Sequence, residues 1–183
     1  MKLVEKIWQS KSENIVNPVA FSELARNLAK AIDIEGREFL TDEDRKRANQ
    51  EIRDPRERDE HLRKLAGRRE EEYKNLPYET WILEKDGWKD RQNKPTQIRK
   101  FYDAIFKLNQ RARAGATNWP SIVAQLHRQL ALVHYAKGRK LVTDTFVSMM
   151  EELIKAVNRP EDLQVITDFL ETFMAYYKEC RPN

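Results

Sequence analysis

Hydrophobic residues recur at helical spacing through most of this 183-residue chain, and the pattern is clearest in the last ninety residues. There, four apolar stripes repeat every three or four positions, as on one face of an α-helix. Short connections separate them, so the pattern predicts a helical bundle. The stripes are Ile98, Phe101, Tyr102, Ile105, Phe106, Leu108 and Ala112; Ile122, Val123, Leu126, Leu130 and Val133, running into Tyr135; Phe146, Met149, Met150, Leu153, Ile154 and Val157; and Leu163, Ile166, Phe169, Leu170, Phe173 and Tyr177.

A further helix is predicted near the N-terminus. Asn17 and Pro18 form a good N-cap and first-turn pair, and an apolar stripe runs from Phe21 to Ile32 before Gly36. At the other end of the chain, Glu161 and Asp162 suit the first turn of the last helix through the helix macrodipole. The predicted fold class is therefore all-α, a compact bundle of about five helices.

Charged residues are the majority from about residue 35 to 74, where Thr41 with Asp44 resembles a capping box. Asp54 and Pro55 suit the start of another helix. The apolar stripe of this tract is thin, which favours a solvated charged arm. We therefore expect three parts: an N-terminal helix packing on the bundle (1–34), a charged helical insertion or arm (35–93) and a basic helical-bundle core (94–183). The segment that contains Trp81, Ile82, Leu83 and Trp88 is too apolar for a free linker, so we expect these residues to dock on another surface.

Composition narrows the class of protein. Charged residues make up 35% of the chain, against about 25% in an average soluble protein, and no apolar run approaches the length of a membrane span. The N-terminal segment has no secretory signal pattern, and the single cysteine, Cys180, cannot form an internal disulfide. These features predict a cytoplasmic protein without a membrane partner. Cys180 is expected to be an incidental surface cysteine rather than a reactive thiol.

The net charge of +4 conceals a strong division along the chain. Residues 94–140 hold ten basic residues and one acidic residue, Asp103, whereas residues 141–183 hold four basic and eight acidic residues. The basic stretch indicates an acidic partner such as nucleic acid. The acidic stretch either meets the basic part of a neighbouring copy, head to tail, or is simply a solvated surface.

The basic residues share helix faces. Lys100, Lys107 and Arg111 are spaced at i, i+7 and i+11, opposite the apolar stripe, and Arg128, Tyr135 and Arg139 share a face of the next helix. Gly138 precedes Arg139 and Lys140, so these two cations should sit at a helix end, where unused backbone groups act together with their charge. Tyr102, Trp119 and Tyr135 lie among the cations and are suited to stacking on a base, but the core spacing of both tyrosines favours packing.

Catalytic and cofactor motifs are missing from the sequence. His127 and His134 are seven residues apart rather than three or four, and no cysteine and histidine cluster suggests a metal site. No glycine-rich phosphate loop and no carboxylate dyad occurs, which disfavours a helical nuclease. We predict no catalytic residue, no metal and no cofactor.

With these motifs placed, the second half resembles the small subunit of type III-A CRISPR (Csm) effector complexes. Three segments in order carry the likeness, and they span residues 95–178; residues 21–34 look more loosely like the first helix of the family. The segments are Thr96-Gln97-Ile98-Arg99-Lys100-Phe101-Tyr102, Tyr135-Ala136-Lys137-Gly138-Arg139, and Phe169-Leu170-Glu171-Thr172-Phe173-Met174-Ala175-Tyr176-Tyr177-Lys178.

The resemblance implies a non-catalytic, RNA-binding subunit of an antiviral defence complex, whose copies stack along a ribonucleoprotein filament beside other Csm subunits. Target RNA and guide RNA are the implied nucleic-acid partners. The motifs point to Arg99, Lys100, Lys137 and Arg139 as RNA contacts. Relatives often carry lysines and a proline just before the second motif, where this chain has the apolar run from Leu130 to His134. Arg128 is the expected replacement.

Physical reasoning reaches the same role, because lysine and arginine neutralise phosphates without reading sequence and guide pairing supplies specificity in RNA-guided complexes. A rival interpretation is a helical scaffold or adaptor that binds protein through Trp81, Trp88 and the charged arm. The complete set of predicted RNA-binding residues is Arg99, Lys100, Arg128, Lys137, Arg139 and Lys140, with Lys107 and Arg111 ranked second.

Overall fold

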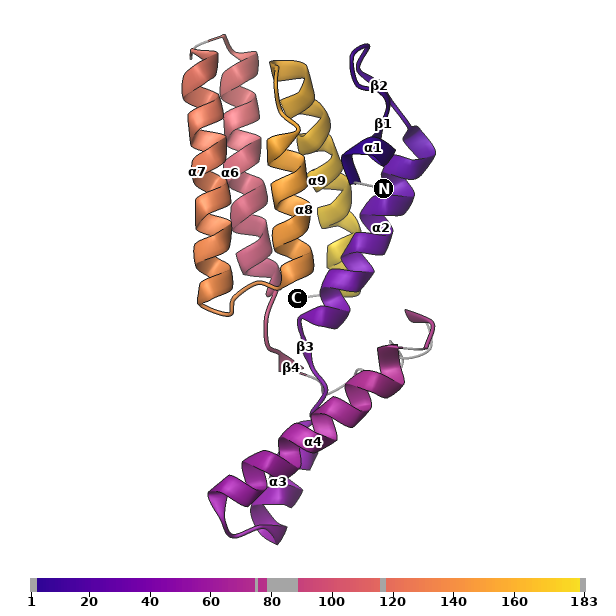
Figure 1. Ribbon diagram of the computed structural model, residues 1–183, viewed down its shortest axis with the longest axis vertical. Helices are drawn as coiled ribbons and strands as arrows, with labels where there is room; N and C mark the ends of the chain where they lie inside the picture. Colours follow the sequence, from indigo (N-terminus) through magenta and orange to yellow (C-terminus); the bar gives the residue numbers. More distant parts are fainter. Residues whose placement is uncertain (1–2, 75, 79–88, 116–117, 182–183) are drawn as a thin grey trace. The chain divides into compact units, whose positions relative to one another are not determined.

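The computed structural model describes residues 3–74, 76–78, 89–115 and 118–181 (Figure 1). The chain forms two compact units: a bundle unit of Met1–Gly36 with Gln92–Asn183, and a small unit of Arg37–Arg91. The described residues form eight helices and four short strands. The prediction of a predominantly helical protein is confirmed. The strands, which pair as two-stranded antiparallel ladders, were not predicted.

The described residues of the bundle unit form six helices: α1 (Leu3–Ile7), α2 (Pro18–Glu35), α6 (Pro95–Arg113), α7 (Trp119–Gly138), α8 (Asp144–Lys155) and α9 (Pro160–Cys180). Helix α9 packs against α2 and α6, α6 packs against α7, and α7 packs against α8 (Figure 1). A hairpin of β1 (Trp8–Ser10) and β2 (Ile15–Val16) connects α1 to α2. Asn17 caps α2, as predicted, by accepting a hydrogen bond from the Ala20 amide at 3.2 Å.

The core of the bundle unit follows the apolar stripes of the sequence. Every predicted apolar position of α9 is buried, and so is every one of α8. Phe169 of α9 meets the ring of Phe21 of α2 edge-on at 5.3 Å, and Phe101 of α6 contacts Phe146 of α8 at 5.8 Å. Burial of such side chains stabilises the fold by roughly 1.5–3 kcal/mol each. Cys180 is also buried, so the expectation of a surface cysteine was wrong.

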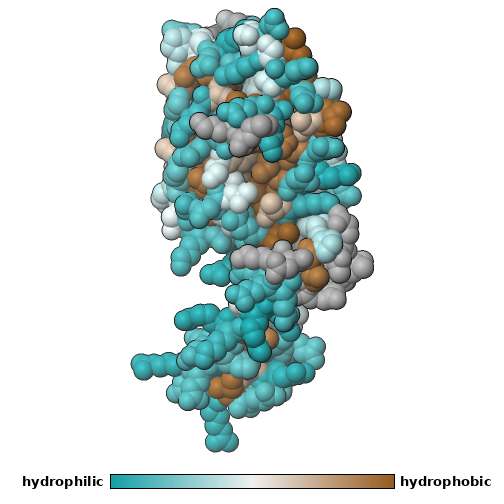
Figure 2. Space-filling model, turned by 45° about the vertical axis from the view of Figure 1, so that its right-hand side comes forward, coloured by the Kyte–Doolittle hydropathy of each residue, from teal (hydrophilic) through white to brown (hydrophobic). Residues whose placement is uncertain are grey.

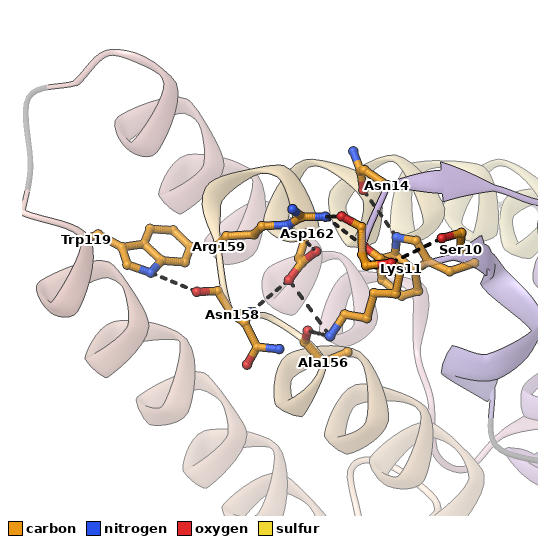
Figure 3. Close-up of polar contacts among 10 residues, drawn as sticks. Ser10, Lys11, Asn14, Trp119, Ala156, Asn158, Arg159 and Asp162 are labelled. Carbon is orange, nitrogen blue, oxygen red and sulfur yellow. Dashed lines mark hydrogen bonds and ion pairs between the residues drawn. The ribbon is translucent and has the colours of Figure 1, made fainter.

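A polar cluster ties the start of α9 to the β1–β2 hairpin (Figure 3). The buried carboxylate of Asp162 accepts hydrogen bonds from the Asn158 amide at 3.0 Å and from Arg159 Nε at 3.3 Å. Arg159 Nη2 also donates to the carbonyl of Lys11 at 2.7 Å, and Lys11 donates to the carbonyl of Ala156. Asp162 thus accepts direct hydrogen bonds at the start of α9, in addition to the macrodipole effect expected from its sequence position.

The small unit has a narrow apolar core of its own. Helices α3 (Asp42–Glu51) and α4 (Pro55–Lys74) pack around Leu40, Ala48 and Leu62. The predicted capping box at Thr41 is present, and β3 (Arg37–Glu38) pairs with β4 (Lys89–Asp90). On the face drawn in Figure 2, hydrophilic residues predominate, in keeping with the highly charged sequence, and apolar residues also reach the surface of the bundle unit. The predicted docking residues Trp81, Ile82, Leu83 and Trp88 lie outside the described residues.

Candidate nucleic-acid interface

Helix α6 presents a row of cations toward its border with α7. Ile98, Phe101, Ile105 and Leu108 are buried, whereas Lys100, Lys107 and Arg111 are exposed on another face of the helix. Arg111 Nη1 donates a hydrogen bond to Gln125 Oε1 of α7 at 2.8 Å. This contact places the row next to α7.

Helix α7 contributes a matching row. Arg128, Tyr135 and Arg139 are all exposed and recur at i, i+7 and i+11. Tyr135 and Arg139 line a groove of about 320 Å³ between the two helices, and Lys100 lines its other side. We call Lys100, Lys107, Arg111, Arg128 and Arg139 the basic strip. Asp103 is the only acidic residue between residues 94 and 140, so the stretch that carries the strip supplies ten basic residues and one acidic residue.

Lys140 extends the strip at the end of α7. The helix ends at Gly138, as predicted, and Lys140 adopts a left-handed backbone with φ of 57°. The amides of Lys140 and Leu141 donate to the carbonyls of Lys137 and Ala136, at 2.8 and 2.9 Å. This arrangement is a Schellman motif with lysine where glycine is usual. We expected unused backbone groups at this helix end to act together with the charges of Arg139 and Lys140. That expectation was wrong, because the C-terminal end of a helix presents carbonyl acceptors, which cannot donate a hydrogen bond to a phosphate.

The structure separates Arg99 from Lys100, although they are neighbours in the sequence. Arg99 lines a different groove, of about 240 Å³, between α6 and α9. Its Nε atom lies 3.9 Å from Asp103 Oδ2. Successive residues of an α-helix point about 100° apart, so Arg99 and Lys100 face different neighbouring helices.

Lys137 also lies outside the basic strip. Its ammonium group forms an ion pair with Asp144 at the start of α8. One turn earlier, His134 Nε2 lies 2.8 Å from Glu151 Oε1 of α8, and this hydrogen bond lowers the pKa of Glu151. This face of α7 is therefore directed to α8. Within the described residues, no group of histidine, cysteine, aspartate or glutamate side chains is arranged to hold a metal ion.

The three aromatic residues considered for base stacking have different environments. Tyr102 is half-buried against Phe106, and burial together with the Glu171 charge raises its pKa. Trp119 is half-buried, and its Nε1 donates to the carbonyl of Asn158 at 3.2 Å (Figure 3). Tyr135, by contrast, is 63% exposed. The prediction that Tyr135 packs in the core was wrong.

Sequence reasoning did not identify the groove itself. Gln97, Gln129 and Leu132 line it beside Tyr135, and Leu132 is 42% exposed. The spacing in the sequence could have revealed this face of α7, because Arg128, Leu132, Tyr135 and Arg139 recur at i, i+4, i+7 and i+11. The buried residues Ile122, Leu126 and Val133 occupy a different face.

The fold and the site thus define a helical bundle with a cationic face. The family model described as Csm2 Type III-A matches residues 70–183. The chain therefore belongs to the Csm2 family, the small subunits of type III-A CRISPR effector complexes, which confirms the resemblance carried by the sequence motifs. Membership implies association with other Csm subunits. Comparison with curated proteins finds no match, and neither does comparison with solved structures.

None of the helices in the described part of the chain is both long and apolar enough to cross a lipid bilayer.

Proposed function

We propose that this chain is a non-catalytic RNA-binding subunit that contacts the sugar–phosphate backbone of target RNA or of its duplex with the guide. The observation that supports this proposal best is the basic strip. Lys100 and Arg139 come from two different helices yet line one groove. Side chains so arranged release counterions when they neutralise phosphates, and they do so without reading base sequence.

The proposal separates the eight predicted RNA contacts into two groups. The basic strip and Lys140 form the primary backbone contact, because they are exposed along one pair of helices. Arg99 and Lys137 are secondary contacts, since each lies beside an acidic residue and faces another helix. This ranking differs from a ranking by sequence motif alone.

The salt dependence of RNA binding tests the proposal. A fluorescein-labelled, unstructured 20-nucleotide RNA is titrated with protein between about 50 and 200 mM salt, and affinity is measured by fluorescence anisotropy. The variant Lys100→Ala/Arg139→Ala should bind more weakly, and its logarithmic salt slope should shrink by roughly 1.4, or about 0.7 per lost phosphate contact on a single strand.

The matched control is Lys64→Ala/Lys155→Ala, which removes two positive charges elsewhere. Both lysines are exposed and already paired, Lys64 with Glu60 at 2.7 Å and Lys155 with Glu151 at 3.6 Å. The salt slope of this control variant should equal that of the wild type. An equal loss of slope in both variants would reduce the basic strip to a contribution of net charge, and an unchanged slope in the first variant would refute the assignment.

We further propose that copies of the chain stack head to tail along the filament. Support comes from the charge division, since residues 94–140 carry a net charge of +9 and residues 141–183 carry −4. Heterologous contacts between unlike surfaces of identical copies generate open filaments. Sedimentation velocity over a range of protein concentrations should show association that weakens with salt; a monomer at all concentrations and low salt would argue that stacking requires the rest of the complex or does not occur.

A further inference from the structure

Tyr135 has an unusual position for an aromatic residue in a helical bundle. Its side chain is 63% exposed, and Leu132, one turn earlier on the same helix, is 42% exposed. Both line the groove between α6 and α7, which in Figure 1 run side by side. An exposed aromatic ring with an exposed leucine next to it provides an apolar surface within an otherwise cationic face.

Cations flank this apolar surface. The guanidinium of Arg139 lies over the Tyr135 ring, with its carbon atom 5.8 Å from the ring centroid. Lys100 lines the groove from α6. The site therefore combines one aromatic ring and two positive charges that can reach phosphates. Gln97 and Gln129 add amide groups that can both donate and accept hydrogen bonds.

A nucleotide is the ligand that matches this combination. Each nucleotide of an RNA strand carries a flat base with an apolar face and an adjoining anionic phosphate. Stacking on an aromatic side chain tolerates any base, because every base has a π-face, while lysine and arginine hold the backbone. An acidic peptide would use the two cations, but its aliphatic carboxylate side chains have no π-face to stack on the ring.

We propose that Tyr135 is a stacking platform for one unstacked base of single-stranded RNA, with Lys100 and Arg139 holding the phosphates on either side of that base. This inference rests on the proposed RNA-binding function and goes beyond it, since it assigns a base contact to a surface otherwise argued to read only the backbone. It predicts a part of the affinity that depends on bases and is independent of salt.

Two probes of equal charge separate stacking from backbone contact: a decamer of uridylate, and a decamer of the same ribose–phosphate chain without bases. The full-length wild-type chain should bind the uridylate decamer at least about fivefold more tightly than the abasic decamer, with similar salt slopes. Tyr135→Ala and Tyr135→Leu should lose this preference and keep the slope. Tyr135→Phe, which retains the ring, should keep both.

A spectroscopic measurement reports stacking directly. A single 2-aminopurine placed within the uridylate decamer should lose fluorescence on binding to the wild type and to Tyr135→Phe. It should lose much less on binding to Tyr135→Ala. Because Tyr135 is exposed, its replacement should leave the far-ultraviolet circular dichroism spectrum and the unfolding transition of the chain unchanged.

The outcomes distinguish the two proposals. If wild type and Tyr135→Ala show the same preference for the uridylate decamer, the stacking inference fails and the backbone proposal stands. If Tyr135→Ala weakens the binding of both decamers equally and reduces the salt slope, Tyr135 only orients Arg139, and stacking is refuted. If Tyr135→Ala weakens binding of decaglutamate as much as binding of uridylate, the site takes an acidic protein segment instead. If the wild type binds neither decamer, the proposed RNA-binding function itself fails.

Discussion

Arg181 donates a hydrogen bond from Nε to the Asp33 carboxylate at 2.6 Å, joining the segment after α9 to α2 in the interior of the bundle unit. The side chains are 1% and 0% exposed. Arg181 also donates to the carbonyls of Gln92 and Asn93, at 2.8 and 3.0 Å. One side chain thus connects three segments that are far apart in the sequence, including the point where the chain returns to the bundle unit.

Replacing Arg181 with alanine should destabilise the bundle unit by about 3–5 kcal/mol, because it breaks a buried ion pair with Asp33 and removes the donor to the carbonyls of Gln92 and Asn93. Urea unfolding measures this loss. Lys155→Ala, which breaks an exposed ion pair with Glu151, is the control and should change the free energy of unfolding by less than about 1 kcal/mol. Equal effects of the two substitutions would contradict the role assigned to Arg181.

Lys140→Gly should make the protein more stable and a weaker RNA binder. Its left-handed backbone, with φ of 57°, is unfavourable for any side chain and readily adopted by glycine, so the free energy of unfolding should rise by roughly 0.5–1 kcal/mol. Removal of the cation should reduce the salt slope of RNA binding by about 0.7. Thermal unfolding and anisotropy titrations test the two effects separately.

Gly138→Ala provides a comparison that changes stability alone. A methyl group at this position would meet no atom within 4 Å, and the residue is helical. Alanine should therefore stabilise the helix by roughly 0.5–1 kcal/mol without altering RNA binding. Loss of stability in either Lys140→Gly or Gly138→Ala would show that the end of α7 makes contacts beyond those described.

Lys100→Ala and Lys137→Ala should have unequal effects on RNA binding, although both lysines are exposed and both belong to the sequence motifs. Lys137 already has Asp144 as its partner, so its contribution to counterion release should be smaller. Lys100→Ala should lower the salt slope by about 0.7. Equal slopes for the two variants would favour the ranking by motif over the ranking by structure.

Low pH should reduce the stability of the small unit, because it protonates Asp44. Burial raises the pKa of Asp44, but hydrogen bonds from Arg69 and Thr41 outweigh this effect and lower it to about 2. A depressed pKa in the folded state stabilises the protein above the unfolded pKa, near 4, and this stabilisation is lost as pH falls toward 2. Between pH 5 and pH 2 the loss should be on the order of 1–2 kcal/mol.

Urea unfolding at several pH values, monitored for helix content, tests this expectation. Asp44→Asn keeps the size of the side chain and removes its charge, so the variant should be less stable at pH 5 and should depend less on pH below 4. An unchanged dependence on pH in Asp44→Asn would assign acid sensitivity to other carboxylates.

The sequence predicted the helices and their ends well where chemistry is local. Asn17 and Thr41 cap helices as expected, and the stripe of α9 is buried throughout. The prediction from spacing failed at Tyr135, which lies near the core positions at the end of the apolar stripe of α7. Neither α6 nor α8 covers this position, so the ring is exposed. Spacing within one helix cannot tell which neighbours its faces will meet.

The same reasoning explains what could be predicted of the site. The sequence identified a concentration of cations between residues 94 and 140, because charge can be counted without a fold. It could not distinguish Arg99 from Lys100, since both lie in one motif. Only the packing of α6 between α7 and α9 directs them into different grooves.

The amino-acid sequence by itself therefore determined that this protein is helical, where its bundle helices lie and which stretch carries the positive charge, because these follow from local periodicity and composition. The tertiary structure decided which cations act together, why Tyr135 is exposed and where Arg181 is buried. Those relationships join residues up to 148 positions apart, as in the contact between Arg181 and Asp33, and they depend on which helices become neighbours.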